Sequence, residues 1–156
     1  MTFFDSLRAY IRRRQVQALN QRASRVTLVK QPQDAPPGSF VYPGIDFVDR
    51  IKVSGQDVGY VSYGISPLRD RVYISMLDIE PAHQRQGISL GVLWQLWLTY
   101  QVPIVPLHQY ASSDGFWTLA RKRFAAAEAL IEGELRGFDA LEHAKQRWQH
   151  LAPEPE

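Results

Sequence analysis

The segment from Ile74 to Tyr100 changes from a strand pattern to a helix pattern across one short polar loop. The run 72–79 is rich in β-branched and apolar residues, and Glu80-Pro81 ends it. From Leu90 onward, apolar residues recur at three- and four-residue spacing, which predicts an amphipathic helix. A strand that enters a helix through a short loop exposes the unpartnered N–H groups of the first helical turn. This segment therefore predicts an anion site, because the helix dipole is positive there.

The loop between the strand and the helix has the composition that a diphosphate requires. Gly87 lets the backbone approach a phosphate closely, and Ser89 is small enough not to block that approach. The alternative is an ordinary strand–turn–helix with a glycine in its turn.

This segment resembles the acyl-CoA signature of the GNAT acetyltransferase superfamily, in which L-x-V-x-P leads into [RQ]-x-x-G-x-[GA]. The residues that carry the resemblance are Leu77, Ile79, Pro81, Gln84, Arg85, Gln86, Gly87, Ile88 and Ser89. Ser89 stands where the family usually has Gly or Ala. The resemblance implies that the loop amides hold the CoA diphosphate and that the strand backbone pairs with pantetheine. It also implies acetyl-CoA, or another acyl-CoA, as co-substrate.

A second family segment fits more loosely. There the family has an Asn, an Ala and then a Tyr that commonly protonates the departing CoA thiolate. Here Ser112 or Ser113 lies near the place of the Asn, and Trp117 or Leu119 lies near the place of the Tyr. Through this correspondence Ser113 and Trp117 become expected cofactor contacts. Trp and Leu offer no usable acid, so the thiolate would be protonated differently.

The remaining segments give a consistent sequence of elements. We expect a helix over 3–23, a helix capped near Ser112 to Asp114, and helices through 125–151. The expected strands cover 25–30, 46–53, 58–65, 71–79 and 101–107. The last two strands flank a helix, which implies a parallel pair that Pro103 and Pro106 interrupt.

These elements predict the α+β class. We expect a GNAT-like, mostly antiparallel central sheet flanked by helices, with a basic N-terminal helix and a helical C-terminal tail. One domain should cover 1–151, and 152–156 should be a frayed end. The family usually builds its acceptor site from helices between the first two strands. The corresponding region here is short and rich in proline, so the N-terminal helix is an alternative contributor.

Positive charge is concentrated at the start of the chain. Residues 1–30 hold seven Arg and Lys against the single Asp5, giving 7 − 1 = +6, whereas the whole chain carries +2. Arg12, Arg13 and Arg14 could contact nucleic acid, an acidic protein or an anionic membrane. The simpler interpretation, which we prefer, is that the helix packs Leu7, Tyr10, Ile11 and Ala18 on the domain and leaves its arginines in water.

Composition excludes several other classes of protein. Apolar residues make up 45% and charged residues 22%, as in globular proteins. The absence of cysteine removes disulfides, thiolate nucleophiles and cysteine metal sites. No signal peptide or membrane-spanning run is evident, so cytoplasm is the expected compartment. The histidines lack metal-ligand spacing, and we expect no metal site.

The sequence offers few groups for acid–base chemistry. His108 has a suitable intrinsic pKa and follows the strand beside the expected cofactor strand, although a hydrogen-bonded or surface role is the simpler alternative. Glu80 lies at the end of the cofactor strand, and Tyr73 is an alternative acid.

Together these residues predict an N-acyltransferase that moves an acetyl or other acyl group from acyl-CoA directly to an amine. The alternative is a catalytically silent GNAT-like module whose basic helix binds nucleic acid or protein. An exposed apolar helix face could also support a homodimer.

Overall fold

A computed structural model describes residues 2–31, 45–107, 114–133, 135, 139, 142–144 and 146–147. Its helices are α1 (Phe3–Ser24), α2 (Ile88–Tyr100) and α3 (Asp114–Ala126), with a 3-10 turn η1 (Pro81–His83). Its strands are β1 (Val26–Lys30), β2 (Ile45–Val53), β3 (Gln56–Ile65), β4 (Val72–Ile79) and β5 (Ile104–Pro106). The order and type of these elements follow the sequence prediction closely.

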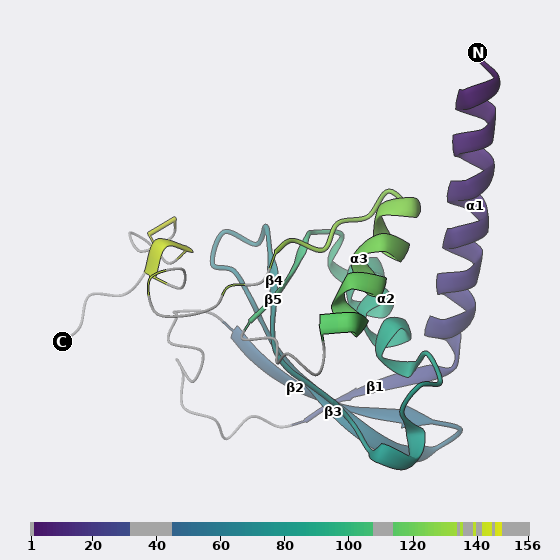
Figure 1. Ribbon diagram of the computed structural model, residues 1–156. Coiled ribbons are helices and arrows are strands. Elements are labelled where there is room, and N and C mark those ends of the chain that lie inside the picture. The colour runs from purple at the N-terminus through teal and green to yellow at the C-terminus, as the bar shows by residue number, and fades with distance from the viewer. Residues whose placement is uncertain are drawn as a thin grey trace.

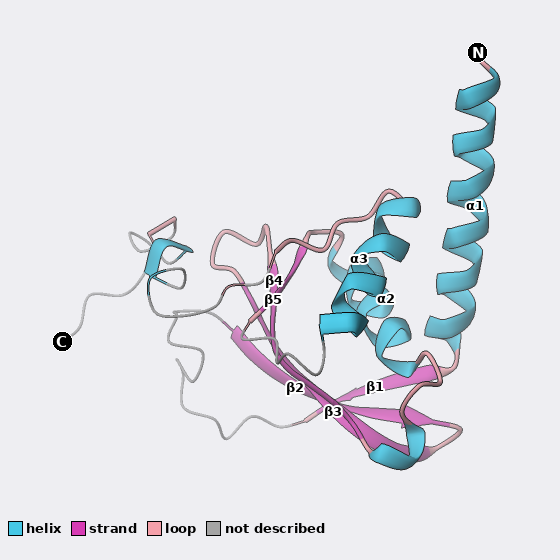
Figure 2. Cartoon of the chain, viewed as in Figure 1, coloured by secondary structure: helices cyan, strands magenta, loops and turns pink. Residues whose placement is uncertain are grey.

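The five strands form one sheet in the order β1-β2-β3-β4-β5. The first four strands pair antiparallel, and β4 pairs with β5 in parallel through the crossover helix α2. The three helices lie on the same side of this sheet (Figures 1 and 2), where the main apolar core lies. The predicted α+β fold class, a mostly antiparallel sheet with flanking helices, is therefore confirmed.

Helix α2 lies at the centre of the helical layer. It is buried along most of its length, which suits its nearly continuous apolar sequence. Trp94 packs edge-on against Phe124 of α3 at 5.2 Å between ring centroids. The indole Nε1 of the same Trp94 donates a hydrogen bond of 2.8 Å to Asn20 of α1. These contacts fix α2 between its two neighbours and so position its N-terminus.

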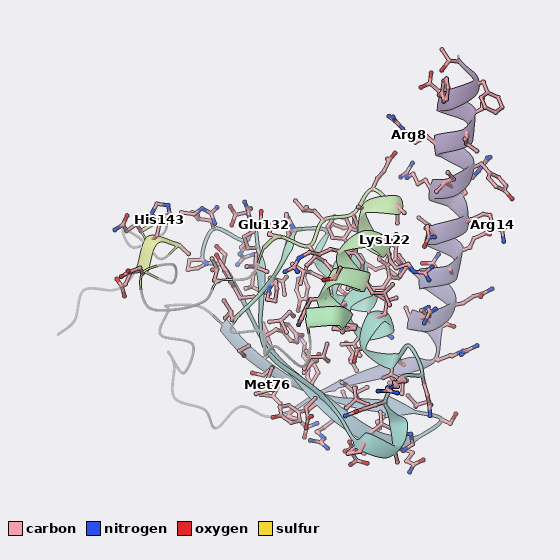
Figure 3. All side chains as sticks on the ribbon, viewed as in Figure 1. Arg8, Arg14, Met76, Lys122, Glu132 and His143 are labelled. Atoms are coloured by element: carbon pink, nitrogen blue, oxygen red, sulfur yellow. The ribbon has the colours of Figure 1, made fainter. Side chains whose placement is uncertain are left out.

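Helix α1 begins with a capping box, in which Thr2 accepts from the Asp5 N–H and the Asp5 carboxylate accepts from the Thr2 N–H. Its C-terminal half packs on the domain through the buried Leu19 and Ala23. Its N-terminal half extends beyond α2 and α3, carrying the labelled Arg8 and Arg14 (Figure 3).

The predicted packing face of α1 is wrong for the N-terminal half. Leu7, Tyr10 and Ile11 remain 42%, 48% and 44% exposed. Helical periodicity identified an apolar stripe there, but only the later residues of α1 lie against α2. Periodicity shows which residues share a face, and it does not show which turns of a helix reach the domain.

The chain after α3 also differs from the predicted helical tail. The described residues 129–133 and 135 run alongside β5, with bridges between Ile131 and Ile104 and between Leu135 and Leu107. Glu132 N donates to Ile104 O at 2.8 Å, as in a parallel ladder. Within the described part of the tail, helical residues occur at 139 and 142–144.

Candidate active site

A cavity of about 480 Å³ opens where β4 gives way to α2. Its volume lies in the range of small-molecule and cofactor sites. Its lining residues come from α1, the β4–α2 loop, the start of α2 and the start of α3. They are Arg22, Ile79, His83, Gln84, Arg85, Gly87, Ile88, Ser89, Leu90, Gly115, Phe116 and Leu119.

The backbone of the loop between β4 and α2 is sharply bent. Arg85 and Gly87 both have positive φ, 63° and 77°, and Gly87 is the N-cap of α2. No side chain caps this helix, and Gly91 is the first residue whose N–H finds a helical partner, Gly87 O at 3.1 Å. The N–H groups from Arg85 to Leu90 donate to no other group among the described residues. Consecutive donors of this kind form an anion-binding concavity.

The positive φ angles of Arg85 and Gly87 differ in their conformational cost. Glycine accepts the left-handed conformation freely, which explains Gly87. Arg85 adopts it at some cost in conformational energy, and its side chain is exposed. The side-chain amide of Gln84 supports the turn, because Nε2 donates to Ile79 O at 2.9 Å. Gln84 therefore ties the loop to the end of β4.

The pairing between β4 and β5 stops early. Val72 N donates to Pro103 O at 3.0 Å, and Leu107 N donates to Ile74 O at 2.9 Å. The register between the two strands ends with Ile74 opposite Pro106. Residues 75–79 of β4 therefore have no described strand on that side. The predicted early end of the pairing is observed, but Pro106 is not its cause. The C=O of Pro106 accepts from Leu135 N at 3.0 Å, so the backbone of this residue faces away from β4.

A bulge in β4 changes which of its residues direct their backbone groups toward the open side. Before the bulge these are the even-numbered residues, such as Val72 and Ile74, and after it they are the odd-numbered ones. Ser75 is an extra residue there, because Ser62 of β3 pairs with the residue that follows it. Beyond the bulge, Glu80 N donates to Val58 O of β3. Strand alternation then directs the backbone groups of Leu77 and Ile79 away from β3. Ile79 O is held by Gln84, whereas the N–H and C=O of Leu77 have no partner among the described residues.

The predicted cofactor contacts are only partly brought together. Ile79, Gln84, Arg85, Gly87, Ile88 and Ser89 line the cavity, whereas Leu77, Gln86 and Trp117 do not. Trp117 is instead buried in the main core at 5% exposure, and its neighbour Phe116 lines the cavity. Ser113 lies outside the described residues. Leu119, the alternative to Trp117 in that segment, does line the cavity. Arg22 carries no local sequence signal, because its relation to the loop exists only after folding.

Of the predicted acid–base residues, Tyr73 and Glu80 do not line the cavity. Tyr73 is buried with Val105, Leu107 and Ala144 in a second cluster, separate from the main core. Glu80 is exposed at the end of β4 and contributes to the raised pKa of Arg50, whose main cause is the hydrogen bond to Asp57. His108 lies outside the described residues. His83, which lines the cavity, was not singled out by the sequence.

Two negative findings concern the described residues only. In that part of the chain, no His, Asp and Glu side chains gather in a group able to share a metal ion. Among the described helices, none is long and apolar enough to cross a bilayer.

Comparison with known proteins gives similarity to solved structures. No family model matches the sequence, and no curated protein matches it. The chain is similar to the crystal structure of a GNAT family acetyltransferase from Elizabethkingia anophelis with acetyl-CoA bound. The TM-score is 0.46 and the identity 16%, over 63% of this chain and 74% of that chain. Because this similarity is low, the function has to be inferred from the residues of the chain itself.

Proposed function

We propose that this chain is a GNAT-type N-acyltransferase that takes its acyl group from acyl-CoA. The observation that carries the proposal is the row of N–H groups from Arg85 to Leu90, which have no partner among the described residues and lie beside a cavity of about 480 Å³. A diphosphate would accept hydrogen bonds from these donors and would be stabilised by the α2 dipole. The apolar part of the lining, including Phe116 and Leu119, suits the less polar portions of such a ligand.

The open edge of β4 supports the same proposal. Pantetheine carries amide groups, and an unpaired strand edge binds amides as a neighbouring strand would. Leu77 offers an N–H and a C=O that no described residue uses on this edge, shortly before the loop. A ligand held by its diphosphate at Gly87 would therefore extend its thioester arm along residues 79 to 75. The acyl group would reach the region of the bulge at Ser75.

Acyl transfer to an amine forms a C–N bond, breaks the C–S bond, and moves a proton from the amine toward the departing thiolate. A backbone N–H on the open β4 edge would polarise the thioester carbonyl. His108 remains our candidate for the base, because its intrinsic pKa suits proton removal near neutral pH and it follows β5. Glu80 is the alternative base at the end of β4.

Acetyl-CoA binding tests the proposal through Gly87. At a ligand concentration 100 times Kd, binding should stabilise the wild-type protein by about 2.7 kcal/mol, raising its Tm by roughly 5–10 °C. Gly87→Glu should abolish this rise, because the new side chain would fill the place of the phosphate. Gly133→Glu is the matched control, since Gly133 is exposed and its Cβ would meet nothing within 4 Å. This control should keep the wild-type response.

Turnover separates an enzyme from a binding module. Release of free thiol from acetyl-CoA should rise when the correct amine is supplied from a panel of polyamines, peptides and aminoglycosides. Loss of His108 by His108→Ala should slow that release while leaving acetyl-CoA affinity unchanged. If wild-type protein showed no Tm change with acetyl-CoA, or if Gly87→Glu kept it, the proposal would be wrong.

A further inference from the structure

Arg22, in the last turn of α1, lies against the β4–α2 loop although more than sixty residues separate them in sequence. Its guanidinium lines the cavity, and a Cβ built on Gly87 would be only 2.1 Å from Arg22 Nη1. Gly91 permits α1 to approach α2 this closely, because a Cβ at Gly91 would lie only 2.7 Å from Arg22 O. Helix packing thus places this arginine at the cavity wall.

The position of Arg22 is electrostatically unfavourable within the chain alone. The N-terminus of α2 is the positive end of its dipole, and a cation there is repelled. Arg85 adds a second positive charge to the same cavity, and the first turn of α2 contains no acidic residue. Among the described residues, neither arginine forms an ion pair with a carboxylate. An anion bound between the two arginines would be attracted to both guanidinium groups and to the positive end of α2, and these attractions would offset the repulsion.

Two other partly buried arginines are paired with carboxylates. Arg50 forms a two-bond pair with Asp57 at 2.7 and 2.8 Å, and Arg71 lies 3.0 Å from Glu132. Arg25, the C-cap residue of α1, is exposed, whereas Arg22 is partly buried. Arg22 is thus a partly buried cation whose complement is not a described carboxylate.

We infer that Arg22 binds the diphosphate of acyl-CoA from the α1 side of the cavity, opposite the loop N–H groups. This inference rests on the proposed function and adds a residue to it. The planar guanidinium can donate two parallel hydrogen bonds to a phosphate, which an amide cannot match in charge. The first helix is therefore part of the cofactor site, and its packing on α2 sets the affinity for the nucleotide end of the ligand.

Calorimetric titration of four proteins tests this role: wild type, Arg22→Gln, Arg22→Lys and Arg25→Gln. Arg22→Gln should weaken acetyl-CoA binding about 10- to 100-fold, the range expected for losing a charged hydrogen bond. Arg22→Lys should lie between, because it keeps the charge and loses the paired donors. Arg25→Gln removes an exposed arginine outside the cavity and should bind as the wild type does.

Two further readouts separate binding from a structural role. Without ligand, Arg22→Gln should be at least as stable as the wild type, because it removes a cation from the positive end of α2. Inorganic pyrophosphate should compete with acetyl-CoA for the wild type and more weakly for Arg22→Gln. S-acetylpantetheine, which lacks the diphosphate, should bind both proteins equally.

The outcomes distinguish this inference from the proposed function. If wild type and Arg22→Gln bound acetyl-CoA equally, Arg22 would not contact the diphosphate, and the proposed function would stand. If Arg22→Gln lowered the ligand-free Tm and weakened S-acetylpantetheine equally, its role would be structural and the inference would be wrong. If the wild type bound neither acetyl-CoA nor pyrophosphate, both proposals would fail.

Discussion

Asp49, in β2, is a buried acidic residue with an exposed fraction of only 3%. Its Oδ2 accepts a hydrogen bond of 3.0 Å from the Tyr63 hydroxyl. The pKa of Tyr63 is itself raised, chiefly by burial. Its Oδ1 has no partner among the described residues. Loss of solvation raises the pKa of Asp49, and the Tyr63 hydrogen bond and the charge of Lys30 oppose that rise only in part.

This raised pKa gives a defined pH dependence of stability. A carboxyl whose folded pKa exceeds its unfolded pKa binds more protons in the folded state, so the free energy of unfolding falls as pH rises between the two values. The fall attributable to Asp49 should begin near pH 4, with a slope of at most about 1.4 kcal/mol per pH unit. Asp49→Asn lacks this titration, so its stability relative to the wild type should increase with pH.

Urea unfolding of both proteins from pH 4 to pH 8 measures the difference. If the stability of Asp49→Asn relative to the wild type stayed constant with pH, or decreased as pH rises, Asp49 would not be desolvated as the structure indicates. Sequence reasoning did not single out this residue, because Asp49 stands in a strand whose alternation is regular only in its second half.

At the scale of elements, helices and strands were predicted well because their patterns are local. Alternation and turn residues located β2 and β3, and the helical period located α2. The tail after α3 was not predicted, because its apolar residues fit a helical spacing while the structure uses Ile131 and Leu135 beside β5. A short extended segment that adds to an existing strand carries no period of its own.

The contact between α1 and α2 depends on a glycine inside a helix. A side chain at Gly91 would meet the backbone of Arg22 and Ala23, which cannot move aside as a flexible side chain can. Gly91→Val should therefore cost about 1–3 kcal/mol in the free energy of unfolding, despite the better helix propensity of valine.

Denaturant unfolding of Gly91→Val and the wild type gives this energy. Because α1 must move to admit the side chain, acetyl-CoA affinity should fall as well. Gly133→Val, at an exposed glycine with open space around it, should change neither quantity. Unchanged stability in Gly91→Val would show that the two helices do not cross as closely as described.

At the scale of the whole molecule, the sequence located one half of the candidate site. The loop from Gln84 to Ser89 was found because strand, glycine and helix are consecutive in the chain. The other half, Arg22 from α1 and Phe116 from α3, comes together only through tertiary packing. The open edge of β4 was anticipated from the prolines around β5, whereas the bulge at Ser75 had no visible signal.

The central claim is that the backbone donors from Arg85 to Leu90 hold the phosphates of an acyl-CoA. Amide NMR of ¹⁵N-labelled protein titrated with acetyl-CoA observes these N–H groups directly. We expect saturable shifts that are largest from Arg85 to Leu90, reproduced in that segment by inorganic pyrophosphate. Saturable binding that left those amides unmoved, or no binding by millimolar ligand, would contradict the claim.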